Sequence, residues 1–199
     1  MAEIAQPTDM QALLEAFTER AGAVAAYVTQ VTSIEEVARK IASGELPTTS
    51  GRYTATSALL AALPELRAAL EATGVQLRLA EEVADQNSAS ETARNLAGDI
   101  GLVLALAGVA ETGSFLSAEE TLPARLLGML ADSVIAFLPA RSIVPTLDDA
   151  ALLIAQLSSQ GRRYISLVTG PSRTADIERV LTIGVQGPKS LHIMVLNPW

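Results

Sequence analysis

The chain has 199 residues, of which 49% are hydrophobic and 18% are charged, and its formal net charge is −8. Because aromatic residues make up only 4% of the chain, the core of this globular protein must be mainly aliphatic. The negative charge argues against general binding to nucleic acid or to anionic membranes, although it leaves room for a local basic pocket.

The chain contains no cysteine and a single histidine, His192. It therefore cannot form disulfides, use a thiolate nucleophile or ligate an iron–sulfur cluster through cysteine, and a zinc site is not expected. The first residues lack a signal-peptide pattern, and the longest apolar run, over residues 100–110, is shorter than the roughly 20 residues of a membrane-spanning helix. We therefore expect a cytoplasmic protein without a membrane segment and without a metal site.

The predicted elements alternate between helices and strands. In chain order we expect a helix over 8–19, a strand over 23–31, a helix from Ser33 to Gly44, two helices over 56–63 and 65–73, a strand over 75–79 and a helix over 88–96. Strands over 102–110 and 114–117 follow, then a helix over 123–130, a strand over 133–138, a helix over 147–157, a strand over 164–168, a helix over 174–182 and a final strand over 191–196.

These strands are apolar on both faces, which is typical of a largely parallel sheet covered by helices on both sides. The turn at Glu111, Thr112 and Gly113 between two apolar strands adds a local antiparallel hairpin. No repeat or clear linker divides the chain. We therefore expect a single α/β domain over residues 1–199.

The segment 169–178 joins a predicted strand to a predicted helix. Gly170 allows a tight turn, and Ser172 and Thr174 can cap free N–H groups of the helix. Such a helix start, with Arg173 beside it, is suited to binding an anion. A plain turn, with Arg173 paired to a carboxylate of the same helix, is the alternative.

Arg141 follows the predicted strand over 133–138. Ligands of open α/β sheets bind at the carboxyl ends of the strands. If this strand and the strand over 164–168 run parallel, Arg141 and Arg173 leave the sheet at one edge and together hold a carboxylate or phosphate. The alternative is that Arg141 pairs with an aspartate at the start of the next helix.

Two further features admit two interpretations each. Gly184 and Gly187 permit close approach of a ligand to the backbone, or they merely end a helix. His192 shares a strand face with Met194 and Leu196, so we expect a buried and hydrogen-bonded histidine.

Three segments together resemble the LUD-domain family (DUF162) of the lactate utilization protein C type. They are Ala110-Glu111-Thr112-Gly113-Ser114, the stretch from Arg141 to Leu147, and the stretch from Thr169 to Glu178 followed by Gly184 to Pro188 and Leu191-His192. The match covers roughly residues 99–196. In place of polar residues that many relatives carry before the Glu-Thr-Gly turn, this chain has Val103 and Leu106.

The resemblance implies a fold of the NagB/RpiA/CoA-transferase type. It also implies a role in the oxidation of L-lactate to pyruvate beside iron–sulfur partner proteins. In CoA transferases of this fold class a glutamate beside a similar turn is the nucleophile, which makes Glu111 a catalytic candidate by analogy. The alternative is that Glu111 only stabilises its turn or is solvated.

The leading functional hypothesis is an accessory, non-redox component of L-lactate utilization that carries an anion-binding cleft and binds no cofactor of its own. A partner would supply the redox centre. The alternatives are an acyl- or group-transfer enzyme that acts on a small anionic substrate through Glu111 and the two arginines, and a ligand-binding regulatory module.

We expect the purified protein to show neither flavin nor iron–sulfur absorbance. The lack of cysteine and of a recognisable flavin motif is the reason. A visible spectrum of the concentrated protein is the measurement, and a stoichiometric chromophore would contradict this expectation.

Overall fold

The computed structural model describes residues 7–46, 51–85, 87–174, 182–183, 187–197 and 199. Its centre is a six-stranded sheet in which all neighbouring strands are parallel. The strands, in spatial order, are β1 (Tyr27–Val31), β12 (Ser190–Leu196), β7 (Ser133–Pro139), β4 (Ile100–Leu104), β2 (Tyr53–Ala55) and β3 (Leu77–Leu79). The expected α/β architecture with a parallel sheet is therefore confirmed.

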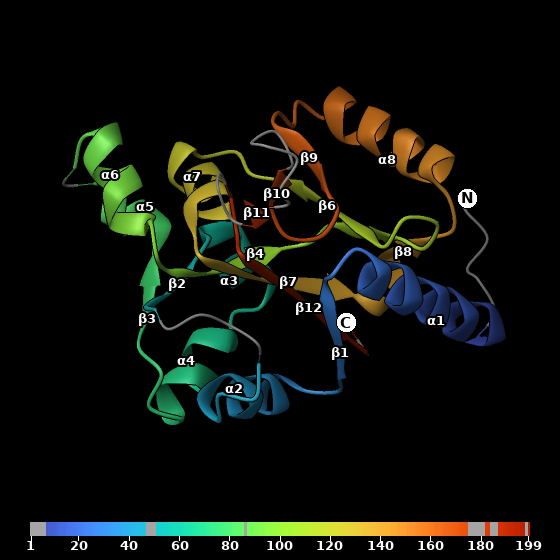
Figure 1. Ribbon diagram of the computed structural model, residues 1–199, viewed down its shortest axis with the longest axis horizontal. Coiled ribbons are helices and arrows are strands. Elements are labelled where there is room, and N and C mark those ends of the chain that lie inside the picture. The colour runs from blue at the N-terminus through green and yellow to red at the C-terminus, as the bar shows by residue number, and fades with distance from the viewer. Residues whose placement is uncertain (1–6, 47–50, 86, 175–181, 184–186, 198) are drawn as a thin grey trace.

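Helices cover both faces of this sheet (Figure 1). On one face lie α2 (Ile34–Ala42), α3 (Ser57–Ala62) and α4 (Leu66–Ala72), and on the other lie α1 (Pro7–Ala23) and α7 (Leu122–Leu130). The remaining helices are α5 (Ala80–Ala84), α6 (Ala89–Leu96) and α8 (Leu147–Ser159). Within the described parts of the chain, none of the helices combines the length and the apolar character needed to cross a membrane.

Two of the predicted helices begin at side-chain caps. The Ser33 hydroxyl accepts the Glu36 N–H at the start of α2, and Thr32 N–H donates to the Glu36 carboxylate. Ser88 and Glu91 exchange hydrogen bonds at the start of α6. These local signals begin both helices where they were expected.

Strand β12 separates the two hydrophobic cores. Leu191, Ile193 and Val195 enter the core beneath α1 and α7, whereas Met194 and Leu196 enter the core beneath α2 and α4. This alternation was predicted from the sequence and is confirmed. It follows from the two-residue period of a strand that is buried on both faces.

A second, four-stranded sheet lies over the α1 and α7 face of the first. Its spatial order is β8 (Ile143–Val144), β5 (Ala107–Val109), β6 (Ser114–Ala118) and β9 (Ile165–Val168). The predicted hairpin is present, because β5 and β6 pair antiparallel. β9 pairs antiparallel with β6, so the condition for Arg141 and Arg173 to leave a parallel sheet at one edge is not met.

The predicted strand over 102–110 is likewise divided between the two sheets. Ala105 N–H donates to Phe137 O of the parallel sheet at 2.9 Å, and the next residue, Leu106, donates to Leu116 O of the second sheet at 2.7 Å. One apolar run therefore contributes a strand to each of the two sheets.

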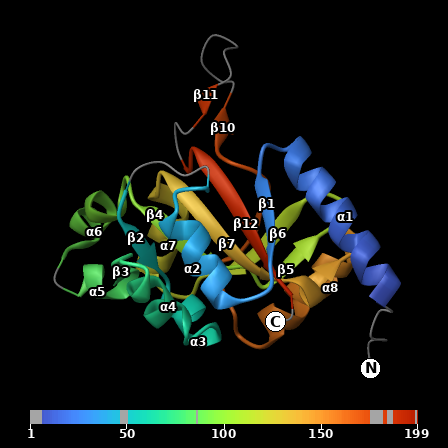
Figure 2. The same cartoon turned by 90° about the horizontal axis from the view of Figure 1, so that it is seen from below.

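The prediction of a helix over 174–182 is wrong at both of its ends, where the structure has strands. β10 (Arg173–Thr174) pairs antiparallel with β11 (Thr182–Ile183), and the residues between them lie outside the described part. Thr174, Thr182 and Ile183 are β-branched, which favours a strand. Figure 2 shows this ribbon beyond the amino end of β12.

Two glycines bring the second sheet against the end of α1. A Cβ atom at Gly113, in the β5–β6 turn, would collide with the backbone of Arg20 and Ala21. A Cβ atom at Gly170 would collide with the carbonyl oxygen of Val24. Both glycines also have positive φ angles, +66° and +72°, so the backbone itself favours glycine there.

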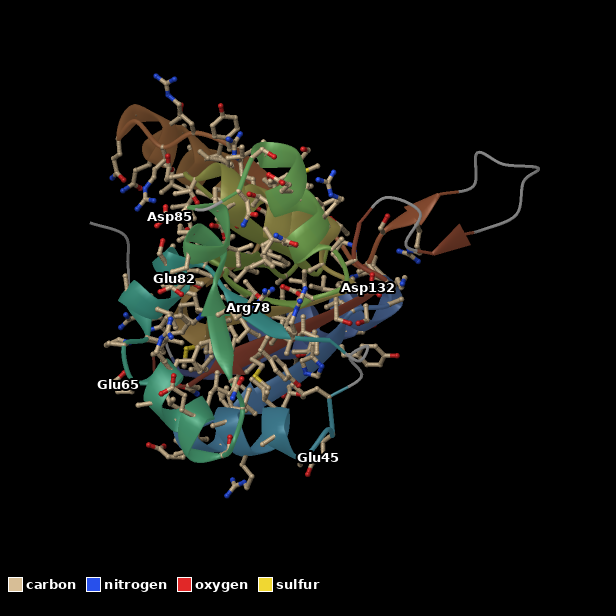
Figure 3. The ribbon with its side chains drawn as sticks, turned by 90° about the vertical axis from the view of Figure 1, so that its left-hand side faces the viewer. Glu45, Glu65, Arg78, Glu82, Asp85 and Asp132 are labelled. Atoms are coloured by element: carbon tan, nitrogen blue, oxygen red, sulfur yellow. The ribbon has the colours of Figure 1, made fainter. Side chains whose placement is uncertain are left out.

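A buried carboxylate joins the amino ends of three parallel strands. Asp99 is fully buried; it accepts hydrogen bonds from Thr54 Oγ1 at 2.7 Å and from Arg52 Nε at 3.1 Å. Arg78 of β3, labelled in Figure 3, donates to the same Asp99 oxygen as Thr54. Two cations and a hydroxyl therefore satisfy this buried charge.

Replacing Asp99 with Ala should lower the free energy of unfolding by about 2–4 kcal/mol, because it removes charge-assisted hydrogen bonds and takes away the carboxylate that accepts the O–H of the buried Thr54. Urea unfolding followed by circular dichroism measures the change. The control is Glu71→Gln, which removes an exposed pair with Arg67 at 3.9 Å and should cost less than about 0.5 kcal/mol. Equal losses would contradict a special role of Asp99.

Replacing Gly113 with Ala should destabilise the protein by about 2 kcal/mol or more, since the new Cβ meets backbone atoms and the φ angle is positive. Gly22→Ala, at the end of α1, is the matched control. It meets no atom within 4 Å and should be neutral or slightly stabilising. Thermal unfolding of both variants tests the contact, and tolerance of Ala at Gly113 would refute it.

Candidate functional site

A cavity of about 370 Å³ lies between the two sheets and beneath α7. The parallel sheet contributes Val103, Val134 and Leu191 to its wall, and α7 contributes Ala124, Leu126 and Gly128. These walls are apolar. A largely apolar cavity of this size with a few polar groups is the usual form of a small-molecule site.

The floor of the cavity is one face of the β6–β9 ribbon. Ser117 lies opposite Ser166, and Phe115 lies opposite Val168. Because side chains of a strand alternate between faces, one face presents Phe115, Ser117 and Glu119 from β6 and the residue after it, and Tyr164, Ser166 and Val168 from β9 and the residue before it. The ribbon is thus apolar toward Phe115 and polar toward Glu119.

Arg125 lies on the first turns of α7 and also lines the cavity. The Thr121 hydroxyl caps this helix by accepting the Ala124 N–H at 3.3 Å, and Arg125 Nε donates to Thr121 O at 3.4 Å. The Arg125 guanidinium carbon lies 3.6 Å from the centre of the Tyr164 ring, a cation–π contact. Tyr164 has a φ of +54°, which is unusual for a residue other than glycine.

Glu119 is the buried titratable group of the cavity. Only 8% of the residue is exposed, and the one hydrogen bond to its carboxyl group within the described chain comes from Ser117 at 3.4 Å. Burial, together with the charges of Glu81 and Glu120 and against a lowering by Ser117, raises the pKa of Glu119 to about 7. Glu119 therefore exists in both protonation states near neutral pH.

The mouth of the cavity is rimmed by exposed apolar side chains. Leu122, Met129 and Tyr164 are 45%, 60% and 56% exposed, and all three line the cavity. Such an arrangement is typical of a site that a ligand or partner covers. With a guanidinium and a protonatable carboxyl group inside, the cavity can bind a polar group and move a proton.

Only part of the predicted site reaches this cavity. Gly170 and Val103 line it, whereas Leu106 is not among its lining residues. Ser172 and Gly187 lie together near its end, because Ser172 N–H donates to Pro188 O at 2.8 Å and a Cβ at Gly187 would come within 2.9 Å of the Ser172 Cβ. The close approach predicted for Gly187 thus serves contact within the protein.

The other members of the predicted anion site do not form a helix start. Arg173 is exposed on β10, and the Thr174 backbone pairs with Thr182, so the helix that was to bind the anion does not begin there. The Thr174 side chain and Gly184 lie outside the described part of the chain.

The prediction that Arg141 and Arg173 share one cleft is also wrong. Arg141 lies in the short turn η1 (Ala140–Ser142), directly after the carboxyl end of β7. Arg173 precedes β12, whose first residue pairs with the first residue of β7. The two arginines are therefore at opposite ends of the parallel sheet, because β9 belongs to the second sheet. Arg141 makes no ion pair with a described residue, so the alternative pairing with an aspartate is not observed either.

Glu111 lies outside the cavity. Its carboxylate accepts the Leu147 N–H at 2.8 Å, and its own N–H donates to Pro145 O at 3.0 Å. It thus caps the first turn of α8, beside the Thr146 cap, and this geometry favours the turn-stabilising interpretation over a nucleophile.

His192 has the structural role that was predicted. The residue is 4% exposed, its Nε2 lies 2.9 Å from Thr29 Oγ1, and its ring stacks on Tyr27. Burial, together with the charge of Lys40, lowers the pKa of His192 to about 4, so the ring is neutral at physiological pH.

Sequence reasoning missed Glu119, Arg125 and Tyr164. The available signal was weak: Ser117 and Glu119 continue the alternate positions of the strand that begins at Ser114, so the strand turns polar on one face. The partners of this face on β9 become apparent only from the strand register.

Comparison with known proteins identifies the family. The model of the LUD domain matches residues 14–196. Lactate utilization protein C 1 of Bacillus mycoides (strain KBAB4) is 36% identical over 103 residues, which cover 50% of this chain and 44% of that protein. Lactate utilization protein C of Bacillus velezensis is 30% identical over 139 residues, covering 63% and 58%.

The chain spans about half the length of the curated relatives it matches. A crystal structure of a DUF162 family protein from Deinococcus radiodurans superposes with a TM-score of 0.64 at 20% identity, covering 94% of this chain and 98% of that one. This likeness concerns the fold. With the LUD match extending over nearly the whole chain and over every residue that lines the cavity, the protein belongs to the LUD domain family.

Proposed function

We propose that the protein is an accessory, non-redox component of L-lactate utilization that acts in the cytoplasm with iron–sulfur partner proteins. The names of the relatives and the LUD family support a role in lactate utilization. A chain without cysteine cannot hold a cysteine-ligated cluster, so a partner would supply the electron carrier.

The observation that carries a ligand-binding role is the cavity between the two sheets. It is built entirely from the LUD-matched part of the chain, and it combines apolar walls with Arg125 and Glu119. Arg125 takes the place of Arg141 and Arg173 as the proposed cation for an anionic ligand. The parallel sheet flanked by helices supports, as architecture, the proposed relationship to NagB/RpiA/CoA-transferase-like proteins.

A group-transfer enzyme is the second candidate, and one observation favours it. A buried carboxyl group with a pKa near 7, facing a cavity, is suited to general acid–base catalysis. In that case Glu119, and not Glu111, would be the reacting carboxyl group. A regulatory module would use the same cavity for binding without turnover.

Deletion of the gene should abolish or strongly slow growth on L-lactate as sole carbon source. Growth on pyruvate should stay normal, because pyruvate lies after the oxidation step, and the intact gene in trans should restore growth on L-lactate. Growth rates on the two carbon sources are the measurement. Unimpaired growth on L-lactate, in a strain without a second copy of the gene, would eliminate the proposed role.

A further inference from the structure

We propose that the cavity binds a small monocarboxylate with an apolar tail, and that Glu119 holds a proton when this ligand is bound. This inference rests on the proposed function in taking the cavity as the ligand site. It assigns the ligand class and a proton-linked binding step to Arg125 and Glu119.

Arg125 provides the group that recognises a carboxylate. Stacking on the Tyr164 ring and the bond from Nε to Thr121 O fix the plane of its guanidinium group. Within the described part of the chain, its two terminal nitrogens make no hydrogen bond or ion pair. A held guanidinium with two free amino groups matches the two oxygens of a carboxylate.

Glu119 provides an unsatisfied carboxyl group in the same cavity. One of its oxygens accepts the long bond from Ser117, and the other makes no hydrogen bond within the described chain. No cation lies within 4 Å of it there, so Arg125 and Glu119 line one cavity without satisfying each other. A buried carboxylate without a cation is unfavourable, whereas a neutral carboxyl group can donate a hydrogen bond.

The charged groups around Glu119 favour its neutral form. Glu81 approaches from α5, where its carboxylate accepts hydrogen bonds from Ser57 and Thr121, and Glu120 follows directly in the chain and pairs with Arg162 at 3.7 Å. Burial and these two carboxylates raise the pKa of Glu119 to about 7. On the α7 side the charged group that lines the cavity is Arg125.

The protonation state of Glu119 then decides whether an anion can bind. Ionised Glu119 would repel a ligand carboxylate held on Arg125, whereas neutral Glu119 would donate a hydrogen bond to it. The complex therefore contains one proton more than the free protein at high pH. Affinity must fall as the pH rises through about 7.

The apolar tail follows from the rest of the cavity. Phe115, Val103 and Leu191 line its inner part, and Leu122 and Met129 lie at its mouth. A space of about 370 Å³ is larger than a three-carbon acid needs. The walls beyond the polar end favour an aliphatic or aromatic body, whose burial adds affinity.

Calorimetric titration with hexanoate tests the proposal, with hexylamine and hexanol as probes of the same length. For the intact protein, hexanoate affinity should fall about tenfold from pH 6 to pH 8, since the neutral fraction of Glu119 falls from about nine-tenths to one-tenth. Hexanol affinity should be weaker at pH 6 and nearly independent of pH. Hexylamine should bind worst.

Two variants in the same cavity should change hexanoate binding in opposite ways. Glu119→Gln keeps the shape and always offers an N–H donor, so its affinity should be independent of pH and higher than that of the intact protein at pH 8. Arg125→Lys keeps the charge but loses the two-pronged donor, so its affinity should fall about tenfold at both pH values while the pH dependence remains. Circular dichroism confirms that both variants are folded.

Hexylamine binding that strengthens with pH would overturn the proposal and make Glu119 an ammonium site. Hexanoate affinity that is independent of pH, or no measurable binding of monocarboxylates from butyrate to octanoate, would overturn it as well. The lactate role fails separately, by normal growth of the deletion strain. Binding as described with normal growth would therefore retain the ligand site and reject only the lactate role.

Discussion

The contact between the end of α1 and two glycine turns is the constraint on which the candidate site depends. Gly113 lies against the α1 backbone and Gly170 against the carbonyl oxygen of Val24, directly after α1, so that no side chain fits at either glycine. The hydroxyls of Ser114 and Thr169, one residue from each glycine, lie 2.7 Å apart and join the two turns. Because α1 also packs into the core above the parallel sheet, this contact fixes the second sheet relative to the first. The cavity is the space that remains beneath α7.

The sequence predicted those features of the fold that arise from neighbouring residues. The helix starts at Ser33 and Ser88, the two faces of β12 and the β5–β6 hairpin were all found where they were expected. Short elements such as β2, β8 and α5 were missed because two to five residues carry too little periodicity. The division of strands between two sheets was missed for another reason. An apolar run looks the same whether its hydrogen-bond partners are in β7 or in β6, and only the packed fold decides between them.

The site was harder to predict than the fold because its polar groups are distant in sequence. Ser117 and Ser166 face each other across 49 positions, and Arg125 meets Tyr164 across 39. Packing explains most of the residues that the family resemblance singled out. Gly113 and Gly170 leave room for the end of α1, and Glu111 caps α8. Residues that are specific for a family can thus serve the packing of the fold, whereas the groups suited to chemistry lie on the strands that this packing positions.

The apolar side chain of Val103 has a direct consequence for recognition. Val103 lines the wall that β4 contributes to the cavity, so that wall offers no hydrogen bond from a side chain. Neighbouring Val134 and Leu191 are apolar as well, which leaves the whole face of the parallel sheet without a polar side chain in the cavity. Among the described residues, the polar side chains that line the cavity therefore lie on the β6–β9 ribbon, at the residues that flank it and on α7. A ligand that is polar at both ends would leave one end unsatisfied against Val103, which costs more than an apolar tail in the same place. The arrangement of polar and apolar side chains in the cavity thus favours ligands with a single polar end.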